Sequence, residues 1–242
     1  MRLALCLLAA LLAPALSART ILAIGAHAGD MELTCGALLA HQSRLGDRVV
    51  LLHLSLGERG KPGVPPETYA AQKKREAEAA AKALGAEVLF GPWQDGDVPT
   101  TDEAARWVAA QIKTVQPNLV LTHWKNSIHK DHAAAHRLVV NAVLFAAIEG
   151  TRTVRSVYYA ENWEDSEAFQ PYLYFAVEDR DAEDWHKAAL AYEFTHAPFS
   201  GFDYIRYYDG LRMVRGAEAR RRLAIAFDIE PTGKRRVLDA LP

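Results

Sequence analysis

The sequence predicts an α/β domain built around a doubly wound, mostly parallel β-sheet of the Rossmann-like kind. Short apolar runs at residues 20–24, 49–52 and 119–122 are continuous rather than alternating, which is typical of strands that helices cover on both faces. Between these runs lie longer segments whose apolar residues recur at helical spacing. Strands and helices therefore alternate without a break up to about residue 147, and this alternation favours a parallel sheet.

Each expected element is bounded by residues that begin or end regular structure. Gly46 and Gly85 follow the first two helical patterns and are typical C-terminal stops. Thr100 and Glu103 have the spacing of a capping box at the start of the third helix, which Pro117 ends. The predicted strands are 20–24, 48–54, 87–90 and 119–122, and the predicted helices are 33–45, 67–84, 100–115 and 131–147.

Towards the C-terminus the alternation becomes less regular. Residues 156–160 and 172–177 have strand-like composition, whereas residues 182–192 and 202–222 have helical patterns. A chain of 242 residues is long enough for one sizeable core and does not require two. We therefore expect a single domain over residues 19–242, with a less regular C-terminal part.

The first 18 residues have the pattern of a signal peptide. A short basic start precedes an almost wholly apolar run at residues 3–16, and residues 15–17 place small side chains where a signal peptidase reads them. The apolar run is shorter than the roughly 18 to 20 residues that a membrane-spanning helix needs. We expect cleavage near Ala18 and export of the mature chain, periplasmic or secreted, with no stable membrane span.

The composition narrows the range of functions. The formal net charge is −2 and the isoelectric point is near 6.5, so the chain lacks the basic field that nucleic-acid binding requires. Cys6 lies in the expected signal peptide, which leaves Cys35 as the one cysteine of the mature chain and excludes an intramolecular disulfide. We expect Cys35 to be buried on the apolar face of its helix.

Metal-type side chains follow two of the predicted strands. His27 and Asp30 lie in the turn after the first strand, and a loop rich in His and Asp follows the fourth. In the strand order 3-2-1-4-5 these strands are neighbours, so the loops at their carboxyl ends converge and favour a zinc site. The alternative is that His27 is an ordinary turn histidine and that Asp30 caps the next helix. The second cluster contains His123, His129, Asp131 and His132.

Two short motifs contain these residues apart from His123. The first reads Ala-His-Ala-Gly-Asp at residues 26–30, and the second reads His-Lys-Asp-His at residues 129–132. They resemble the Ala-His-Pro-Asp-Asp and His-x-Asp-His motifs of the PIG-L/LmbE-like family of zinc-dependent N-deacetylases. A Gly-Glu pair at residues 57–58 resembles a further family segment, and residues 75–85 resemble, less closely, the family's Arg-x-x-Glu-Ala…Leu-Gly helix. The likeness spans about residues 19–140.

The resemblance implies roles for seven residues. Three zinc ligands leave a fourth position for water, as a hydrolytic zinc site requires. His129 corresponds to the family residue that assists the tetrahedral intermediate and the leaving group, and we expect Asp131 to orient it, because a carboxylate beside a histidine fixes its tautomer. Arg75 and Asp95 correspond to positions that line the substrate pocket. The implied zinc ligands are His27, Asp30 and His132.

One family residue is missing. The family's first aspartate of the Asp-Asp pair is the general base that deprotonates the attacking water, and this chain has Gly29 at that position. Loss of a general base weakens a catalyst by a factor of about 10²–10⁴. Either another group replaces it, or the reaction runs slowly without a base, or the protein binds metal without catalysis. The candidate replacements are Asp131, Glu32, Glu58 and Asp95.

The residues and the resemblance together predict an exported, zinc-dependent hydrolase. It would remove the acetyl group from an N-acetylated amino sugar or glycoconjugate of the N-acetylglucosamine type. The expected partners are this substrate and Zn²⁺, without nucleic acid. Because of Gly29, the alternative is a catalytically weak or silent homologue that binds glycans in a zinc-dependent way.

Overall fold

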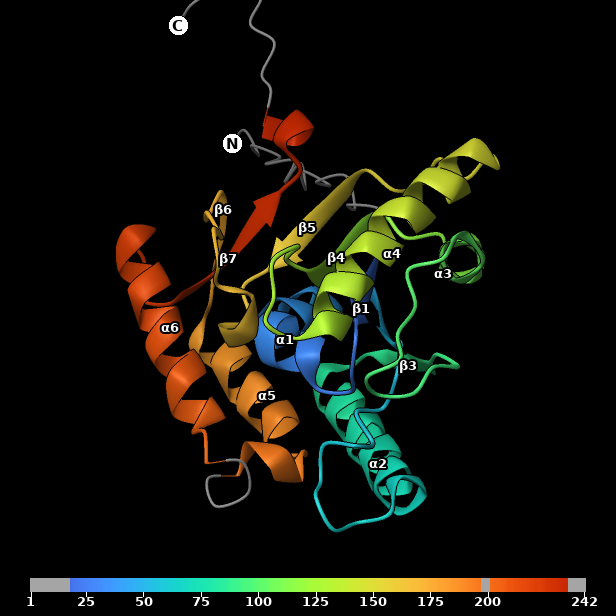
Figure 1. Ribbon diagram of the computed structural model, residues 1–242. Coiled ribbons are helices and arrows are strands. Elements are labelled where there is room, and N and C mark those ends of the chain that lie inside the picture. Colours follow the sequence, from blue (N-terminus) through green and yellow to red (C-terminus); the bar gives the residue numbers. More distant parts are fainter. Residues whose placement is uncertain (1–17, 197–200, 235–242) are drawn as a thin grey trace, which may run out of the picture.

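The computed structural model describes residues 18–196 and 201–234, which form one seven-stranded sheet with helices on both faces (Figure 1). The strand order is β3-β2-β1-β4-β5-β7-β6, which confirms the predicted order 3-2-1-4-5. The first five strands are parallel, whereas β7 pairs antiparallel with both β5 and β6. The strands are β1 (Thr20–Gly25), β2 (Arg48–His53), β3 (Glu87–Phe90), β4 (Leu119–His123), β5 (Ser156–Ala160), β6 (Leu173–Ala176) and β7 (Ala224–Ile229).

The helices form two layers and one addition at the edge of the sheet (Figure 1). On one face α3 packs against α4, and on the other face α1 packs against both α2 and α5. α6 lies against β7, beyond the part of the sheet where strands and helices alternate regularly. The helices are α1 (Asp30–Arg44), α2 (Pro66–Leu84), α3 (Asp102–Val115), α4 (Lys130–Ile148), α5 (Asp179–Ala189) and α6 (Tyr204–Glu218).

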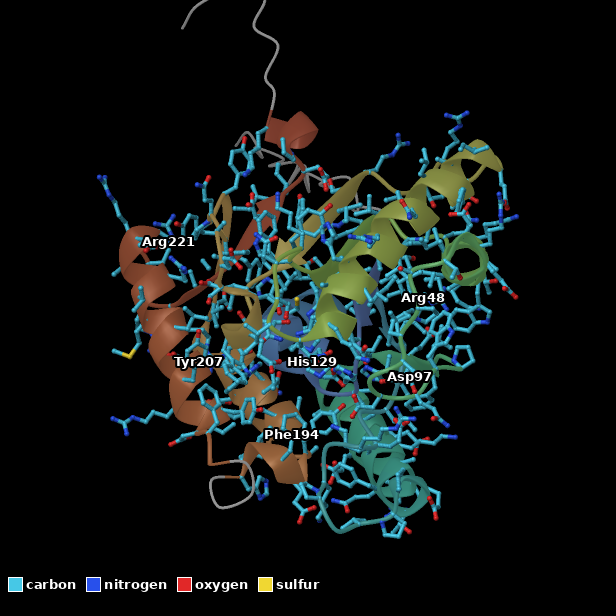
Figure 2. The ribbon with its side chains drawn as sticks, in the orientation of Figure 1. Arg48, Asp97, His129, Phe194, Tyr207 and Arg221 are labelled. Carbon is cyan, nitrogen blue, oxygen red and sulfur yellow. The ribbon has the colours of Figure 1, made fainter. Side chains whose placement is uncertain are left out.

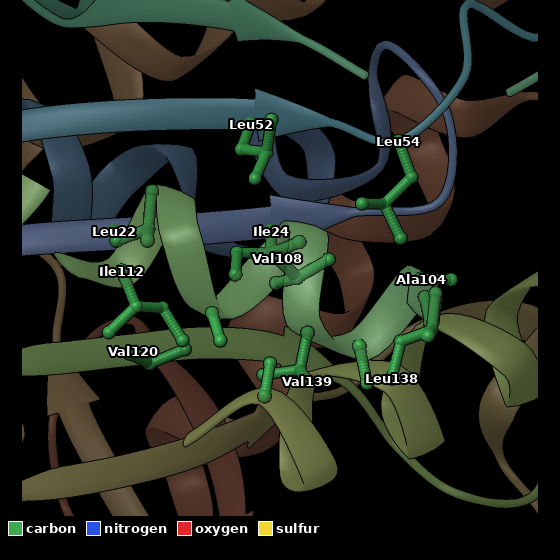
Figure 3. Packing of buried hydrophobic residues seen from close by; sticks show 14 of the residues in the cluster. Leu22, Ile24, Leu52, Leu54, Ala104, Val108, Ile112, Val120, Leu138 and Val139 are labelled. Atoms are coloured by element: carbon green, nitrogen blue, oxygen red, sulfur yellow. The ribbon is translucent and has the colours of Figure 1, made fainter. Parts of the chain in front are cut away.

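Successive residues of the central strands point into two different cores. Leu22 and Ile24 of β1 pack in the cluster formed with α3 and α4. Figure 3 shows both residues in this cluster, together with Val108 of α3. Ile21 and Ala23 of the same strand join the cluster formed with α1, α2 and α5. After Thr20 every position of β1 is therefore buried, which explains why its apolar run in the sequence is continuous.

Two helix starts differ from the prediction for local reasons. α1 begins at Asp30, three residues before its predicted start, because Gly29 adopts a φ of 111° and turns the chain directly into the helix. The cap of α3 is Thr101 rather than Thr100. Its side-chain oxygen accepts a hydrogen bond from the N–H of Ala104 at 3.3 Å.

The C-terminal part contains a strand that the sequence analysis missed. The predicted helix at residues 202–222 ends at Glu218, and β7 begins at Ala224. The chain folds back closely over Gly216, where an added Cβ would lie only 2.6 Å from the carbonyl oxygen of Arg222. This reversal carries β7 between β5 and β6 and completes the sheet.

Cys35 is buried in α1, as predicted, and burial raises the pKa of its thiol to about 12. Within the described residues no helix is long and apolar enough to cross a membrane. Residues 1–17 of the expected signal peptide lie outside the described part of the chain.

Candidate functional site

The carboxyl ends of β1 and β4 are neighbours in the sheet, and they bring the two predicted clusters together. The turn after β1 and the loop after β4 meet at one cavity of about 200 Å³. Figure 2 shows His129 at the amino end of α4, on this edge of the sheet. The predicted residues that line the cavity are His27, Asp30, Asp95, His129 and His132.

The turn between β1 and α1 folds the side chain of Asp30 back towards His27. Its Oδ2 accepts a hydrogen bond from the backbone N–H of His27 at 2.7 Å, and the same oxygen lies 3.5 Å from Nδ1 of that histidine. The residue that caps α1 is Gly29, so Asp30 is the first residue of the helix and not its cap. This geometry overturns the capping alternative for Asp30.

Two of the three donor-atom separations among the expected ligands suit one metal ion. Oδ2 of Asp30 lies 3.5 Å from Nδ1 of His27 and 3.7 Å from Nε2 of His132. Ligand atoms about 2.1 Å from one tetrahedral ion are about 3.4 Å apart. Two imidazoles and one carboxylate also form a donor set of the borderline kind that divalent transition metals prefer.

A second grouping includes His123. One donor atom each of Asp30, His123 and His132 lies within 4.8 Å of the others. His123 is completely buried and is not among the residues that line the cavity. Its Nε2 lies 3.1 Å from the backbone nitrogen of Ala26 and 3.0 Å from Oδ2 of Asp30. Although burial lowers it, Asp165 and Asp30 raise the pKa of His123 to about 9, so Nε2–H donates to Asp30. We therefore treat His123 as a support for Asp30 rather than as a ligand.

The carboxylate of Asp165, in the short 3₁₀ helix η1 (Trp163–Asp165), holds two imidazole rings. Oδ1 lies 3.0 Å from Nδ1 of His132, and Oδ2 lies 2.9 Å from Nδ1 of His123. Although burial raises it, the two histidines lower the pKa of Asp165 well below its usual range. A proton on Nδ1 of His132 leaves Nε2 free towards Asp30. The sequence analysis missed Asp165 because it lies beyond both motifs.

The carboxylate of Asp131 orients His27, not His129 as predicted. Oδ2 of Asp131 lies 3.2 Å from Nε2 of His27, and it accepts a hydrogen bond from the N–H of Gly96 at 2.6 Å. Oδ1 of Asp95 lies 3.2 Å from the same Nε2. These carboxylates hold a proton on Nε2 of His27, which leaves Nδ1 free for a metal.

His129 is oriented by the backbone of α4. Its Nδ1 accepts a hydrogen bond from the N–H of Asp131 at 3.2 Å, so the imidazole caps the helix. Burial and the nearby charge of His27 lower the pKa of His129, and the ring is therefore neutral at pH 7. The bond to Nδ1 places the proton of this neutral ring on Nε2.

The PIG-L family, described as GlcNAc-PI de-N-acetylase, matches residues 22–143, which is half of the chain. The chain belongs to the PIG-L family. This match confirms the resemblance seen in the two motifs.

Two curated relatives of this PIG-L chain have different activities. A 1D-myo-inositol 2-acetamido-2-deoxy-alpha-D-glucopyranoside deacetylase from Salinispora arenicola is 28% identical over 162 residues, which cover 54% of this chain and 53% of that protein. The chain therefore spans about half the length of this deacetylase. A 4-oxalmesaconate hydratase from Pseudomonas putida is 28% identical over 224 residues, which cover 86% of this chain and 83% of that protein.

A solved structure extends the likeness beyond the PIG-L match. The N,N'-diacetylchitobiose deacetylase from Pyrococcus horikoshii aligns with a TM-score of 0.75 and 16% identity, covering 92% of this chain and 88% of that chain. The shared fold therefore includes the C-terminal part, with β7 and α6.

Lys73, and not Arg75, is the basic residue of α2 that lines the PIG-L cavity. Lys73 is only 3% exposed, whereas Arg75 is exposed and is not among the lining residues. The structure thus does not bring Arg75 to the site. The signal that could have found Lys73 is the family's Arg-x-x-Glu spacing, which indicates position 73 when it is counted back from Glu76.

Phe194 fills the space beside Gly29. Cζ of Phe194 lies 2.7 Å from the place where a Cβ on Gly29 would be, and the φ of Gly29 is 111°. Few residues other than glycine adopt this backbone conformation. The aspartate that the PIG-L motif has at this position is therefore excluded by the turn as well as by the neighbouring ring.

Two of the four candidate replacement bases do not line this cavity. Glu32 is completely buried and accepts a hydrogen bond from the hydroxyl of Tyr192. Glu58 accepts a hydrogen bond from the N–H of Asp95 at 3.0 Å and lines a neighbouring cavity. The other two candidates, Asp95 and Asp131, do reach the site, but their carboxylates contact Nε2 of His27.

Glu164 is a cavity residue that the sequence analysis missed. Its Oε2 lies 3.6 Å from Nδ1 of His132. Burial, with the negative charges of Asp30 and Asp165, raises the pKa of Glu164 to about 7. No motif marks this residue, because η1 lies in the part of the chain that the family match does not reach.

Proposed function

We propose that this protein is a zinc-dependent N-deacetylase that hydrolyses the acetamido group of an N-acetylglucosamine-type sugar or glycoconjugate. The observation that carries the proposal is the arrangement of His27, Asp30 and His132, whose donor atoms lie 3.5 and 3.7 Å apart on either side of the Asp30 carboxylate. Membership of the PIG-L family supports the reaction class.

The metal and the carboxylates around its ligands have different roles. When bound, a divalent ion supplies the Lewis acidity that polarises the acetyl carbonyl and makes water more acidic. Asp131 and Asp95 hold the ring of His27, and Asp165 holds the ring of His132. This support fixes both rings before substrate enters, so no rearrangement of ligands is needed during the reaction.

His129 is placed to serve the later half of the reaction. It lines the cavity, and its Nδ1 is engaged by the backbone, so Nε2 carries the proton. Nε2–H can donate a hydrogen bond to the carbonyl oxygen as negative charge develops there. The neutral ring keeps this proton, so the proton that the leaving nitrogen takes up comes from the group that deprotonates the attacking water. This geometry supports the part of the predicted role that concerns the tetrahedral intermediate.

The wall of the cavity supports a sugar as substrate. Aromatic rings next to carboxylates suit a sugar ring, because the ring faces take its apolar side and the carboxylates accept hydrogen bonds from its hydroxyls. The Salinispora and Pyrococcus relatives are named as deacetylases of N-acetylated sugars. The aromatic residues that line the cavity are Tyr69, Phe194 and Tyr204.

Acetate release tests the proposal directly. The chain from residue 19 onward is purified, its metal content is measured, and acetate is followed with N-acetylglucosamine, N,N'-diacetylchitobiose and inositol-linked substrates. We expect one bound zinc, acetate release that chelation abolishes and zinc restores, and loss of both metal and activity in His132→Ala. The matched control is His186→Ala, on the partly exposed side of α5. Absence of acetate with zinc and with other divalent ions would contradict the proposal.

Export is a separate part of the proposal and has its own test. We expect the full-length chain, produced in a bacterial host, to be recovered from the periplasm or medium with a new N-terminus near residue 18. Replacing the apolar run at residues 3–16 with polar residues should retain it inside the cell. N-terminal sequencing of the unaltered chain that still finds Met1 would count against export.

A hydratase is the second candidate function. Two observations favour it: the Pseudomonas hydratase is matched over 83% of its length, and Gly29 removes the family's general base. Hydration of 4-oxalmesaconate, the compound in the name of that relative, can be followed by the loss of its ultraviolet absorbance. Product in this assay without acetate in the other would favour the hydratase.

A catalytically silent glycan-binding protein gives a third pattern of results. Calorimetry would then detect sugar binding that requires zinc and is lost in His27→Ala. Neither assay would detect product.

A further inference from the structure

Lys73 has an unusual environment for a lysine. Its side chain is 3% exposed, and among residues 18–196 and 201–234 the only hydrogen-bond acceptor that it contacts is the carbonyl oxygen of Ala28, 2.6 Å from Nζ. Nζ also lies 4.5 Å from the ring centroid of Tyr192 and 4.1 Å from that of Phe194. No carboxylate of the described residues forms an ion pair with it, although Lys73 lines the catalytic cavity.

The position of Lys73 relates directly to the missing base. Nζ contacts the residue that precedes Gly29, and it lies over the ring of Phe194. That ring occupies the space where a side chain on Gly29 would begin. Lys73 is therefore an ionisable group beside this place that also lines the cavity. The sequence-based candidates either hold His27 or lie outside the cavity.

The surroundings of Lys73 leave its amine able to exchange a proton. The charged and titratable groups that face it are Glu76 on its own helix, Asp30 and Glu32 on α1 and Asp95 after β3, with Tyr192 beside it. Burial lowers the pKa of Lys73 to about 8 in spite of the four carboxylates. A general base works best when its pKa is near the working pH.

We propose that Lys73 is the proton acceptor that replaces the absent carboxylate at position 29. The proposal rests on the proposed deacetylase function. The neutral amine takes one proton from the attacking water as the water oxygen bonds to the acetyl carbon. When the C–N bond breaks, the proton on Lys73 is released to the product amine, so amide and water become acetate and amine, and Lys73 returns to its neutral form.

The test compares the pH dependence of kcat/KM among variants that separate basicity from charge. Wild type should show a limb that rises with pH through the pKa of Lys73, because only the neutral amine accepts a proton. Lys73→Met should lose this limb and about 10²–10⁴-fold in kcat/KM. Lys73→Arg keeps the positive charge but cannot accept a proton, so it should be as inactive as Lys73→Met. Lys74→Met, at an exposed neighbouring position of α2, is the matched control and should behave as wild type.

Two further measurements guard against loss of the fold. Zinc content and melting temperature are measured for every variant, so that a fall in activity is not mistaken for a fall in metal binding. Lys73→Cys, treated with bromoethylamine, restores an amine of lower basicity at this position. Position 73 lines the cavity, whereas Cys35 is buried away from it, so the reagent reaches only the introduced cysteine in the folded protein. We expect recovered activity with the limb shifted to lower pH.

Each result bears on the deacetylase function, on the base role of Lys73, or on both. Lys73→Arg with near wild-type kcat/KM would overturn the base role, since charge alone would then suffice. If Glu164→Gln loses the rising limb of the pH profile while Lys73→Met keeps it, the proton acceptor is Glu164. This result would also overturn the base role of Lys73. If wild type releases no acetate at all, the deacetylase proposal fails and the role of Lys73 fails with it. Acetate release with unchanged profiles in both Lys73 variants overturns the role of Lys73 alone.

Discussion

At the scale of single residues, Gly29 decides which chemistry the cavity can use. A φ of 111° and the ring of Phe194, 2.7 Å from a Cβ at this place, fix glycine there. The backbone conformation and the neighbouring ring therefore both disfavour a side chain at this position. An aspartate placed there would strain the turn and overlap Phe194.

We expect Gly29→Asp to lower the free energy of unfolding and to leave acetate release no higher than in wild type. Overpacking against Phe194 costs about 1–3 kcal/mol, and a positive φ adds strain for a residue with a Cβ. Urea denaturation and the acetate assay measure the two effects. Gly150→Asp is the control, because Gly150 has a φ of 98° with nothing within 4 Å of its Cβ. A variant at position 29 that is both stable and more active would refute this expectation.

A second prediction concerns Asp131, which holds Nε2 of His27 at 3.2 Å. Asp131→Asn should weaken zinc binding by about 10–100-fold, because residues that orient metal ligands typically contribute this much to affinity. Competition with a chromophoric chelator measures the change. Asp97→Asn, at an exposed position that pairs with Arg59, should leave the affinity unchanged. Equal affinities for Asp131→Asn and wild type would show that the contact does not support the metal.

At the scale of elements, the sequence predicts the parallel part of the sheet well and the antiparallel part poorly. The parallel strands are buried on both faces, and their continuous apolar runs are visible without any knowledge of the fold. β7 (Ala224–Ile229) follows α6 after a short arginine-rich segment, so the helical pattern runs on almost to the strand and does not mark the boundary. Its place between β5 and β6 depends on pairing with distant residues, and local patterns do not contain that information.

The site residues likewise fall into some that the sequence predicts and some that it does not. His27, Asp30, His129 and His132 could be found because short motifs at the ends of buried strands carry them. Asp165 could not, because its role depends on a contact between η1 and the histidines after β4 that no spacing encodes.

The cap of α3 provides a prediction at this scale. Thr101→Ala should lower the free energy of unfolding by about 1 kcal/mol, because Thr101 is the residue whose side chain accepts the N–H of Ala104. Thr100→Ala, one residue earlier, should have little effect. Urea denaturation of both variants compares them under the same conditions. A larger loss in Thr100→Ala would indicate that the capping residue is the one predicted from the sequence.

At the scale of the whole molecule, the metal centre joins segments that are far apart in the chain. Asp30 starts α1, His132 lies in α4, and Asp165 follows β5. An ion that binds here in the folded state, and not in the unfolded chain, stabilises the entire fold.

We therefore expect zinc to raise the melting temperature of the chelated protein. At a free zinc concentration about 100 times the Kd, the gain in stability should be about 2.7 kcal/mol. Differential scanning calorimetry with and without zinc measures it. His132→Ala should show no such gain, whereas His186→Ala should keep it. An equal shift in His132→Ala would place the stabilising ion elsewhere on the protein.

The cavity wall combines residues inside and outside the PIG-L match, and this has a consequence for how new activities arise. His27, Asp30 and His132 lie within residues 22–143, whereas Glu164, Phe194 and Tyr204 lie outside them. Phe194 and Tyr204 carry no carboxylate or imidazole, so substitutions at these two positions can reshape the wall while the expected ligands stay in place. Selection for a new substrate would act first on the C-terminal segment, and laboratory evolution of this enzyme is best begun there.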